Sequence, residues 1–376
     1  MQDLLESLQL HGHLRPEHKA RVTSYAFLRG AEIPALNLTG IDVPDLEPLC
    51  EVKGLRFLEL GGSNRKGEAA RVTLPDLSPL SRIDTLEKLV LRHADLEAPQ
   101  VLAECTGLEE LFLGHSNIEA IDFVASMPGL SRLGIEATAV QDLSPVSACT
   151  SLSELIMHNT QVSALEPLSA ARGLKVLLAF ETPVSSSEPL AAMKGLQVVS
   201  LGGTKVHELE GVRGAKKLRE LGANRTKVSD LSPLEGAKAL ESLSMQHTAI
   251  QDLSPLAGCK KLETLELGGT AVSDLSPLAG LEKLRSVLLS GTKITDISPL
   301  AGHRSLEALH LDRTGITDLS VLANFKKLTM LSLREMQVSD LSPLAGLKKL
   351  VQLDIRGTDV DVGPLAKLGR LRIIGG

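Results

Sequence analysis

Leucine recurs along most of this chain at a fixed interval of 22 residues, and shorter apolar runs accompany each recurrence. The recurring leucines are Leu86, Leu108, Leu130, Leu152, Leu174, Leu196, Leu218, Leu240, Leu262, Leu284, Leu306, Leu328 and Leu350. Backward from these, Leu55 opens a repeat that is nine residues longer, and Ile33 opens the one before it. A constant period of this size is the signature of stacked structural repeats. We predict fifteen repeats over residues 33–370 and a truncated terminal repeat over residues 371–376.

One regular unit, residues 262–283, shows what each position is expected to do. Leu265 and Leu267 alternate with polar residues, which predicts a short strand with one buried face. Four more apolar residues are expected to return to the core from the far side: Val272, Leu275, Leu278 and Leu281. Ser276 directly precedes Pro277, so we expect the serine hydroxyl to cap a helical turn that starts at the proline.

Such a strand cannot bury its apolar face alone, but copies stacked in parallel can. The predicted fold is an α/β solenoid: a parallel, concave β-sheet with turns and short 3-10 or α-helices on the convex side. At a strand spacing of about 4.8 Å, fifteen repeats give an arc roughly 70 Å long. The ninth position of ten repeats is Thr, from Thr138 to Thr314 and again at Thr358. We expect its hydroxyl to bond the backbone of its own turn and of the neighbouring repeat, as an internal ladder.

The unit resembles the 22-residue leucine-rich repeat of the SDS22-like class and of the internalins, which also read LxxLxLxxTxVxDLSPLAGL. The segment VSDLSPLAG occurs at Val272 and Val338 and, with one change, at Val228. The resemblance implies a bacterial protein that binds other proteins through its concave face. Internalins carry a secretion signal and a surface anchor, and this sequence shows neither, so we expect a cytoplasmic location. Secretion by a route without such a signal is the alternative.

The ends and one insertion interrupt the regular pattern. Residues 1–32 contain enough apolar side chains to form a helical N-terminal cap over the first repeat. At the other end, Ile373 and Ile374 fall on a sheet edge, which invites a weak homodimer; a terminus shielded by Pro364 and Arg370 is the alternative. The nine-residue insertion, residues 65–73, is expected to loop out of the solenoid. Its long basic side chains are secondary candidates for contact with a partner: Arg65, Lys66 and Arg71.

Composition excludes several classes of function. The chain is 43% hydrophobic with a net charge of -6 and no long run of one sign, which argues against nucleic acid as a partner. No apolar stretch approaches the roughly 18 residues of a membrane span. No catalytic motif is present, so we predict a protein that is not an enzyme and has no cofactor or metal. Three of the four cysteines stand where other repeats place a core residue, and all four are expected to be reduced thiols: Cys50, Cys105, Cys149 and Cys259.

The concave face is where function is expected. On each strand the third, fifth, seventh and eighth residues of the repeat point outward, and the fifth column is apolar over five successive repeats: Val90, Phe112, Gly134, Ile156 and Leu178. We predict an exposed apolar patch there, with Gly134 as a notch for a partner's side chain. The expected charged rim consists of Lys88, Arg92, Glu110, Arg132, Glu136, Glu154 and Glu181. The remaining partner-binding candidates are Phe57, His93, His115, His158 and Phe180.

A charged cluster near the C-terminus is a second candidate contact region: His310, Asp312, Arg313, Arg334, Glu335, Asp354 and Arg356. Pairing of these charges with one another across the sheet is the simpler interpretation. A row of lysine pairs, such as Lys216 with Lys217 and Lys260 with Lys261, is interpreted as a solvated face.

The sequence thus predicts a protein-binding scaffold that grips a folded partner, for instance to inhibit or neutralise it as an immunity protein or a regulatory subunit. A secreted bacterial effector that acts on a host protein is one alternative. An alternative of another class is a metal or enzymatic site at His93 and His115, which occupy the same position in successive repeats.

Overall fold

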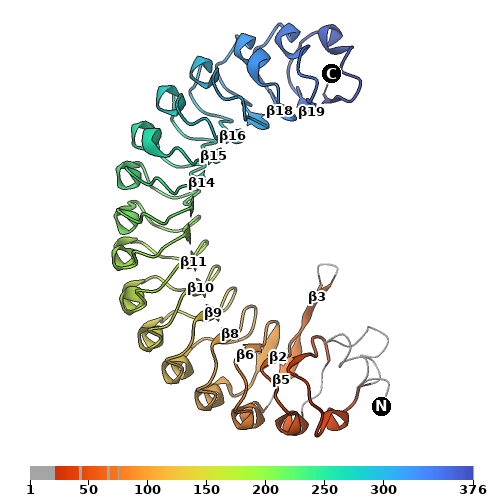
Figure 1. The fold of residues 1–376 in the computed structure, drawn as a ribbon, viewed down its shortest axis with the longest axis vertical. Helices are drawn as coiled ribbons and strands as arrows, with labels where there is room; N and C mark the ends of the chain where they lie inside the picture. Colours follow the sequence, from red (N-terminus) through yellow and green to blue (C-terminus); the bar gives the residue numbers. More distant parts are fainter. Residues whose placement is uncertain (1–21, 42–44, 66–67, 75, 376) are drawn as a thin grey trace. The chain divides into compact units, whose positions relative to one another are not determined.

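The computed structural model describes residues 22–41, 45–65, 68–74 and 76–375, without the side chains of residues 63–70. The chain divides into two compact units at Val184 and Ser185, and each is described by itself. Within each unit the strands lie along the inner side of the turns and the 3-10 helices along the outer side (Figure 1). The predicted architecture of parallel strands and short helical turns is confirmed.

In the first unit seven three-residue strands form a parallel sheet in chain order. They are β1 (Ala35–Asn37), β2 (Phe57–Glu59), β6 (Lys88–Val90), β8 (Glu110–Phe112), β9 (Arg132–Gly134), β10 (Glu154–Ile156) and β11 (Val176–Leu178). The register repeats the 22-residue period: Val90 pairs with Phe112, and Phe112 pairs with Gly134. Residues at the same repeat position therefore stand side by side on neighbouring strands and form columns.

The second unit continues the same plan. Its strands are β12 (Val198–Ser200), β13 (Glu220–Gly222), β14 (Ser242–Ser244), β15 (Thr264–Glu266), β16 (Ser286–Leu288), β17 (Ala308–His310), β18 (Met330–Ser332), β19 (Gln352–Asp354) and β20 (Arg372–Ile374). Neighbouring strands are parallel, and β20 pairs with β19 through Ile373 and Leu353. Within the part of the chain that the structure describes, the other edge of β20 has no strand partner.

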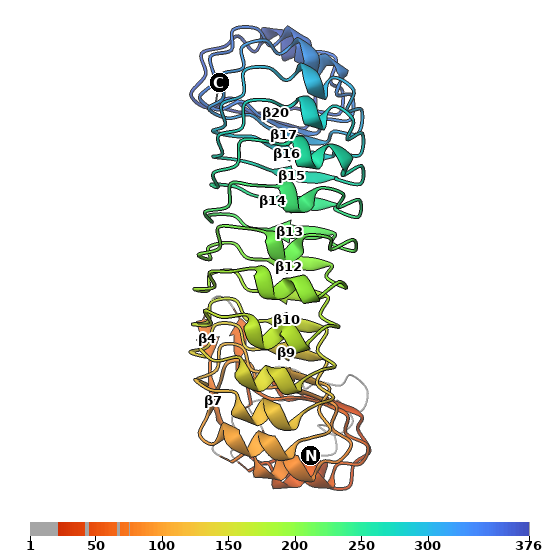
Figure 2. The same cartoon turned by 90° about the vertical axis from the view of Figure 1, so that its left-hand side faces the viewer.

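The outer side of each unit carries 3-10 helices (η), which stack above one another in Figure 2. In the first unit they are η1 (Ala26–Leu28), η2 (Glu47–Glu51), η3 (Ser78–Arg82), η4 (Pro99–Glu104), η5 (Asp122–Ser126), η6 (Ser144–Ala148) and η7 (Glu166–Ala170). In the second they are η8 (Glu188–Ala192), η9 (Glu210–Val212), η10 (Ser232–Leu234), η11 (Ser254–Gly258), η12 (Ser276–Leu278), η13 (Ser298–Leu300), η14 (Ser320–Asn324), η15 (Ser342–Leu344) and η16 (Gly363–Leu365).

The helical turns begin one residue earlier than predicted, and serine does not cap them. In the unit that starts at Leu262, η12 already includes Ser276, Leu275 stands at the N-cap, and no side chain makes a cap bond. Instead Asp274 Oδ1 accepts the backbone N–H of Ser276 at 2.8 Å. The same bond recurs in other repeats, for example from Ser254 to Asp252. The aspartate two residues upstream therefore satisfies the free N–H group, in an Asx turn.

The insertion is more ordered than predicted. Strands β3 (Ser63–Arg65) and β4 (Glu68–Ala70) pair antiparallel, as a hairpin that projects from the strand side in Figure 1. Strand β5 (Val72–Leu74) then pairs in parallel with β7 (Ala94–Leu96). The prediction that all of residues 65–73 loop out is therefore wrong at its end, because Val72 is a buried strand residue. Lys66 lies outside the described residues, as do residues 1–21 of the predicted cap.

The core consists of aliphatic layers, and the threonine column closes it on one side. Thr270 Oγ1 donates to the carbonyl of Leu267, three residues back, at 2.7 Å, and the other nine threonines of the column make the same bond. These bonds stay within one repeat, so the predicted link to a neighbouring backbone is not what this column forms.

The cysteines lie where they were predicted. Cys105, Cys149 and Cys259 are buried, and the thiols of all four cysteines are free. Burial raises the pKa of Cys105 and of Cys149 to about 11, because an apolar environment disfavours the thiolate.

Candidate protein-binding face

The inner face of the first unit is built from four columns of side chains at the third, fifth, seventh and eighth positions of its repeats. From β6 to β11 the third column reads Lys88, Glu110, Arg132, Glu154 and Val176, and the fifth reads Val90, Phe112, Gly134, Ile156 and Leu178. The seventh reads Arg92, Gly114, Glu136, His158 and Phe180, and the eighth reads His93, His115, Ala137, Asn159 and Glu181. The parallel, in-register pairing brings the predicted candidates together on one surface.

The aromatic centre of this face is not exposed, which corrects the sequence-based prediction. Phe112 is only 5% accessible, and Val90 beside it is 6% accessible. Three cations cover the Phe112 ring: Lys88 Nζ lies 5.3 Å, Arg92 Cζ 4.9 Å and Arg132 Cζ 5.4 Å from its centroid. The quadrupole of the ring attracts cations to its face. The charged residues therefore lie across the aromatic centre instead of forming a rim around it.

The covering cations are tied down by carboxylates of neighbouring strands. Lys88 Nζ lies 2.8 Å from Glu110 Oε2, and Arg132 bridges the same Glu110 at 3.2 Å and Glu154 at 2.8 Å. Burial alone raises the pKa of Glu110, but Lys88 and Arg132 outweigh burial and hold this pKa below its ordinary value. The result is a fixed row of alternating charges over the ring.

Gly134 is not an open notch. A Cβ atom on Gly134 would lie 2.6 Å from Phe112 Cδ1 and 3.0 Å from Glu136 Oε2, so side chains of this chain already occupy that space. Glu136 also lies flat over Gly114, where a Cβ atom would be 2.3 Å from Glu136 Cδ. Two glycines on neighbouring strands thus make room for a charged side chain on the sheet.

Glu136 is a buried carboxylate with incomplete hydrogen bonding. It is 5% accessible, and its Oε1 lies 2.8 Å from Arg92 Nε, which reaches across Gly114 from two repeats away. No hydrogen bond of acceptable geometry reaches Glu136 Oε2 or Arg92 Nε from the described residues. A buried polar atom without a partner costs roughly 1–3 kcal/mol. Of the charged residues on this face, Glu136 is the one whose environment is least satisfied.

Flat rings line one margin of the inner face. His93 and His115 stack with centroids 4.4 Å apart, and His158 stacks on Phe180 at 4.1 Å. The predicted proximity of His93 and His115 is confirmed. The pKa of His93 is lowered by burial and, to a smaller extent, by the charges of His115, Arg71 and Arg92. Burial also lowers the pKa of His158. Arg71 links the insertion to this margin, because its Nη2 donates to the His115 carbonyl at 3.0 Å and its guanidinium pairs with Asp95.

The half-buried apolar residues that remain on the inner face are Phe57, Ile156, Val176, Leu178 and Phe180. They flank the charged centre on both sides, and a partner can contact them without rearranging the face. Sequence reasoning named Glu136 only as part of a rim. The signal that could have placed it at the centre is the pair of glycines, Gly114 and Gly134, at different positions of neighbouring repeats.

The eighth column has a backbone property that the sequence analysis did not predict. From His93 to Gly357 its residues have positive φ in both units, between 53° at Ala137 and 74° at Gly357. Nine of them are not glycine and include His93 and His115, at 55° and 60°. The left-handed conformation costs L-residues roughly 1–2 kcal/mol. Nine repeats therefore carry a side chain at this position despite its backbone penalty.

Similar folds are known among solved structures, although no curated protein matches this chain. A family model for two copies of the leucine-rich repeat matches residues 238–280. An internalin (InlF) of Listeria monocytogenes is 22% identical, covers 99% of this chain and 93% of its own, and has a TM-score of 0.64. A leucine-rich-repeat protein of Leptospira interrogans is 18% identical over 93% of this chain and 97% of its own, with a TM-score of 0.79.

The fold is that of a leucine-rich-repeat protein. A plant peptide hormone receptor, solved in complex with RGF2, has the same fold at 18% identity and a TM-score of 0.71, over 86% of this chain and 55% of its own. Leucine-rich repeats typically serve as scaffolds for binding proteins.

The C-terminal charged cluster of this leucine-rich-repeat protein is largely paired with itself. Asp354 holds the Arg356 guanidinium at 2.5 Å, and Arg313 lies 3.9 Å from Glu335. Asp312 accepts the backbone N–H of Arg334 at 2.9 Å and also bonds Ser332. His310 lies on β17. Mutual pairing was the simpler of the two interpretations of this cluster, and the contacts agree with it.

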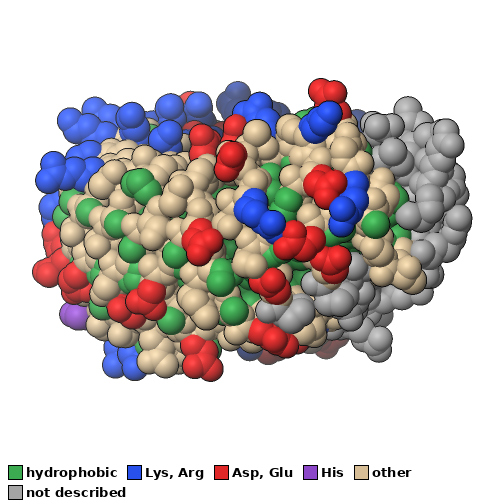
Figure 3. Space-filling model, turned by 90° about the horizontal axis from the view of Figure 1, so that it is seen from below, with side chains coloured by type: hydrophobic (Ala, Val, Ile, Leu, Met, Phe, Trp, Pro, Cys, Tyr) green, Lys and Arg blue, Asp and Glu red, His purple; other side chains and the backbone are tan. Residues whose placement is uncertain are grey.

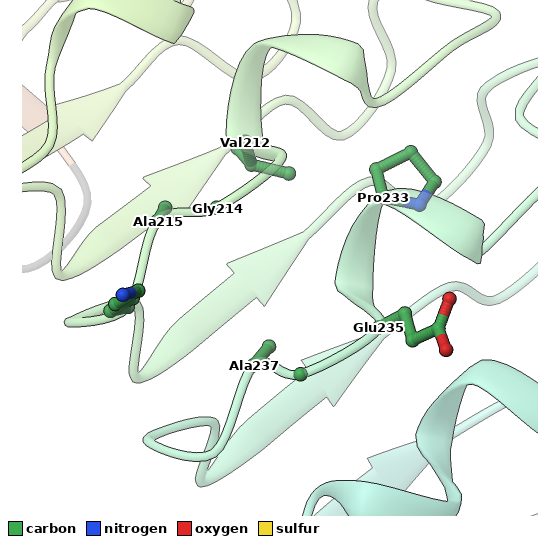
Figure 4. Close-up of a pocket in the computed structure, with 8 residues that line it drawn as sticks. Val212, Gly214, Ala215, Pro233, Glu235 and Ala237 are labelled. Carbon is green, nitrogen blue, oxygen red and sulfur yellow. The ribbon is translucent and has the colours of Figure 1, made fainter.

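The outer side of the second unit has a pocket of about 190 Å³. Figure 4 shows Val212 and Pro233 on the two helical turns, with Ala215 and Ala237 in the segments that follow. Other repeats place larger residues at this position, such as Met193 and Leu281. The pocket exists because two successive repeats have alanine there, so it is a local packing defect.

The remaining described surface is mostly polar. In Figure 3 hydrophobic side chains are scattered singly among polar ones, and Lys and Arg side chains gather along one margin. The lysine pairs of the second unit are exposed, as predicted for a solvated row. Among the described residues, no group of three or more His, Cys, Asp or Glu could hold a metal ion. No helix in the described part of the chain is long and apolar enough to cross a membrane.

Proposed function

We propose that this protein is a non-enzymatic scaffold that binds another protein on the inner face of its first unit. The observation that carries the proposal is the set of in-register columns around Phe112, in which aromatic, aliphatic and charged groups are fixed on rigid strands. Such a mixture is typical of protein interfaces, where a few anchors lie within polar surroundings. The plant receptor of the same fold was solved in complex with RGF2, which supports a protein or peptide as the partner here.

The biological role that fits best is control of a folded partner in a bacterial cytoplasm, as an immunity protein or a regulatory subunit. A secreted effector acting on a host protein is the second candidate, and the structural similarity to an internalin favours it. In both roles the same face makes the contact, so one experiment tests the binding site for both.

The test is affinity capture from a lysate of the source organism with the wild type and with an Ile156→Asp, Leu178→Asp variant. Both residues are half-buried on the inner face, and their replacement adds charge there while Phe112 and Glu136 stay unchanged in sequence. Leu288→Asp is the matched control, because Leu288 occupies the fifth position of its repeat, at the end of β16, and is also half-buried. A protein captured by wild type and control but lost with the double variant supports the proposal.

Equal capture by all three proteins would place the binding site elsewhere. The insertion, through Arg71, and the C-terminal charged cluster are then the next surfaces to test. Circular dichroism of each variant establishes beforehand that the fold is retained.

One further proposal has a separate test. Pairing of β20 across two copies would give a weak homodimer, and a sedimentation coefficient that stays constant with concentration would refute it. The alternative of a metal site at His93 and His115 is not favoured, because the two rings stack face to face and no third ligand joins them among the described residues; metal analysis of the purified protein checks this.

A further inference from the structure

The spare hydrogen-bonding capacity of the inner face lies where Arg92 meets Glu136. Lys88, Arg92 and Arg132 each have a carboxylate oxygen within 3.2 Å, and Glu110 and Glu154 are paired in the same way. Among the described side chains, Glu136 Oε2 is the one buried carboxylate oxygen that no donor reaches. Buried polar groups in folded proteins are nearly always paired, so an exception points to a function or to a missing partner.

The group that covers Glu136 can move. Arg92 is 40% exposed, and its guanidinium rests on the Phe112 ring at 4.9 Å. Its Nε is only 2.8 Å from Glu136 Oε1 but lacks the geometry of a hydrogen bond. A long side chain with a poorly aligned contact is displaced more readily than Arg132, which makes aligned bonds to Glu110 and Glu154.

We infer that Glu136 is the anchor point for an arginine side chain of the partner protein. This inference rests on the proposed function and specifies the chemistry of its partner. The incoming guanidinium takes the place that Arg92 occupies on the Phe112 ring and donates hydrogen bonds to both oxygens of Glu136. The Arg92 side chain is displaced into solvent. Arginine suits the site because its planar fork binds a carboxylate with two parallel hydrogen bonds and stacks on aromatic rings.

Other anchors fit this position less well. An aliphatic or aromatic side chain would seal Glu136 Oε2 from water without giving it a donor, which is unfavourable. An acidic side chain would meet Glu110, Glu136 and Glu154 on adjacent strands. The stacked rings of His158 and Phe180 lie next in the seventh column, and Glu136 raises the pKa of His158 through its charge, although burial lowers it more. The surroundings of Glu136 thus offer acceptors and flat rings, which suit a guanidinium.

The test uses the full chain and four displayed peptide libraries, each of eleven residues, with the central residue fixed as Arg, Lys, Leu or Glu and the others random. Retention on the immobilised wild type is compared with retention on Glu136→Gln, which keeps the shape but removes the charge. Glu154→Gln is the matched control on the next strand. Gly114→Ala is a second variant, because its Cβ would lie 2.3 Å from Glu136 Cδ and would move this carboxylate. Thermal unfolding verifies that each variant folds.

The expected result is that the Arg-centred library is retained at least tenfold better than the Leu- and Glu-centred libraries. Glu136→Gln and Gly114→Ala should remove this preference, and Glu154→Gln should keep most of it, because a hydrogen bond to a charged group contributes a factor of about ten or more. Equal retention of the Arg- and Leu-centred libraries would overturn the inference, as would a preference for arginine that survives Glu136→Gln.

The same experiment separates this inference from the proposed function. Ile156→Asp leaves the Glu136 carboxylate in place but adds charge to the neighbouring apolar surface. If bound peptides are lost with Ile156→Asp but show no arginine preference, the inner face binds proteins and the arginine anchor is wrong. If Ile156→Asp weakens the binding of none of the libraries, both the arginine anchor and the proposed binding face are wrong.

Discussion

The left-handed backbone of the eighth repeat position predicts opposite effects of the same exchange at different sites. Ala137 has a φ of 53°, and Gly291 at the same position of a later repeat has a φ of 70°. An L-residue in this region costs roughly 1–2 kcal/mol. Glycine avoids that cost but loses about 0.4–1 kcal/mol through the greater entropy of the unfolded chain. We therefore expect Ala137→Gly to raise the free energy of unfolding by about 0.5–1 kcal/mol, and Gly291→Ala to lower it by a similar amount.

The packing around Gly291 adds no steric effect to the backbone effect of this substitution. A Cβ atom on Gly291 would lie 3.8 Å from its nearest neighbour, an ordinary van der Waals distance, so the effect there comes from the backbone alone. Gly302 is the control, because it has no positive φ and nothing within 4 Å of its Cβ position. Gly302→Ala should stabilise the protein by about 0.4–1 kcal/mol, through the unfolded chain only.

The assay is urea unfolding followed by circular dichroism, with the free energy compared between variants that share the same slope. Opposite signs for Gly291→Ala and Gly302→Ala are the central expectation. The same sign for both would refute the argument that the eighth position stores backbone strain, and so would a destabilised Ala137→Gly variant.

Two further predictions concern the outer side. Ala237→Leu should fill part of the 190 Å³ pocket, because Leu281 stands at the same position of a later repeat. We expect it to raise the free energy of unfolding by about 1 kcal/mol in the same urea assay. No gain would mean that the short turns there cannot accept a larger residue. The backbone N–H of Ser254, and then its hydroxyl, lower the pKa of Asp252 below its ordinary value. The ionised Asp252 therefore stabilises the fold at any pH above its ordinary pKa, and this stabilisation is lost as the pH falls through the lowered pKa of the folded state. Asp252→Asn should therefore lose less stability than the wild type when urea unfolding is repeated between pH 5 and pH 2, and an unchanged pH dependence would contradict the role given to this bond.

Much of the fold follows from the sequence because its determinants are local and repeated. A strand of alternating leucines, a turn with Asp252 and Ser254, and a threonine that bonds three residues back all act within one 22-residue unit. Thirteen recurring leucines at a fixed spacing therefore predict the stacking, the parallel sheet, the residues that share a column and the burial of three cysteines.

The tertiary structure decided which members of a column are accessible. Phe112 occupies an outward position, but three side chains from the two neighbouring repeats close over it, and Arg92 crosses a whole repeat to reach Glu136. The direction of such long side chains depends on the space that glycines leave on neighbouring strands. In the same way, Val72 became a buried strand residue because β7 offered a free edge. Repeat periodicity fixes where a residue stands, whereas its exposure depends on side chains that meet only after the repeats have stacked.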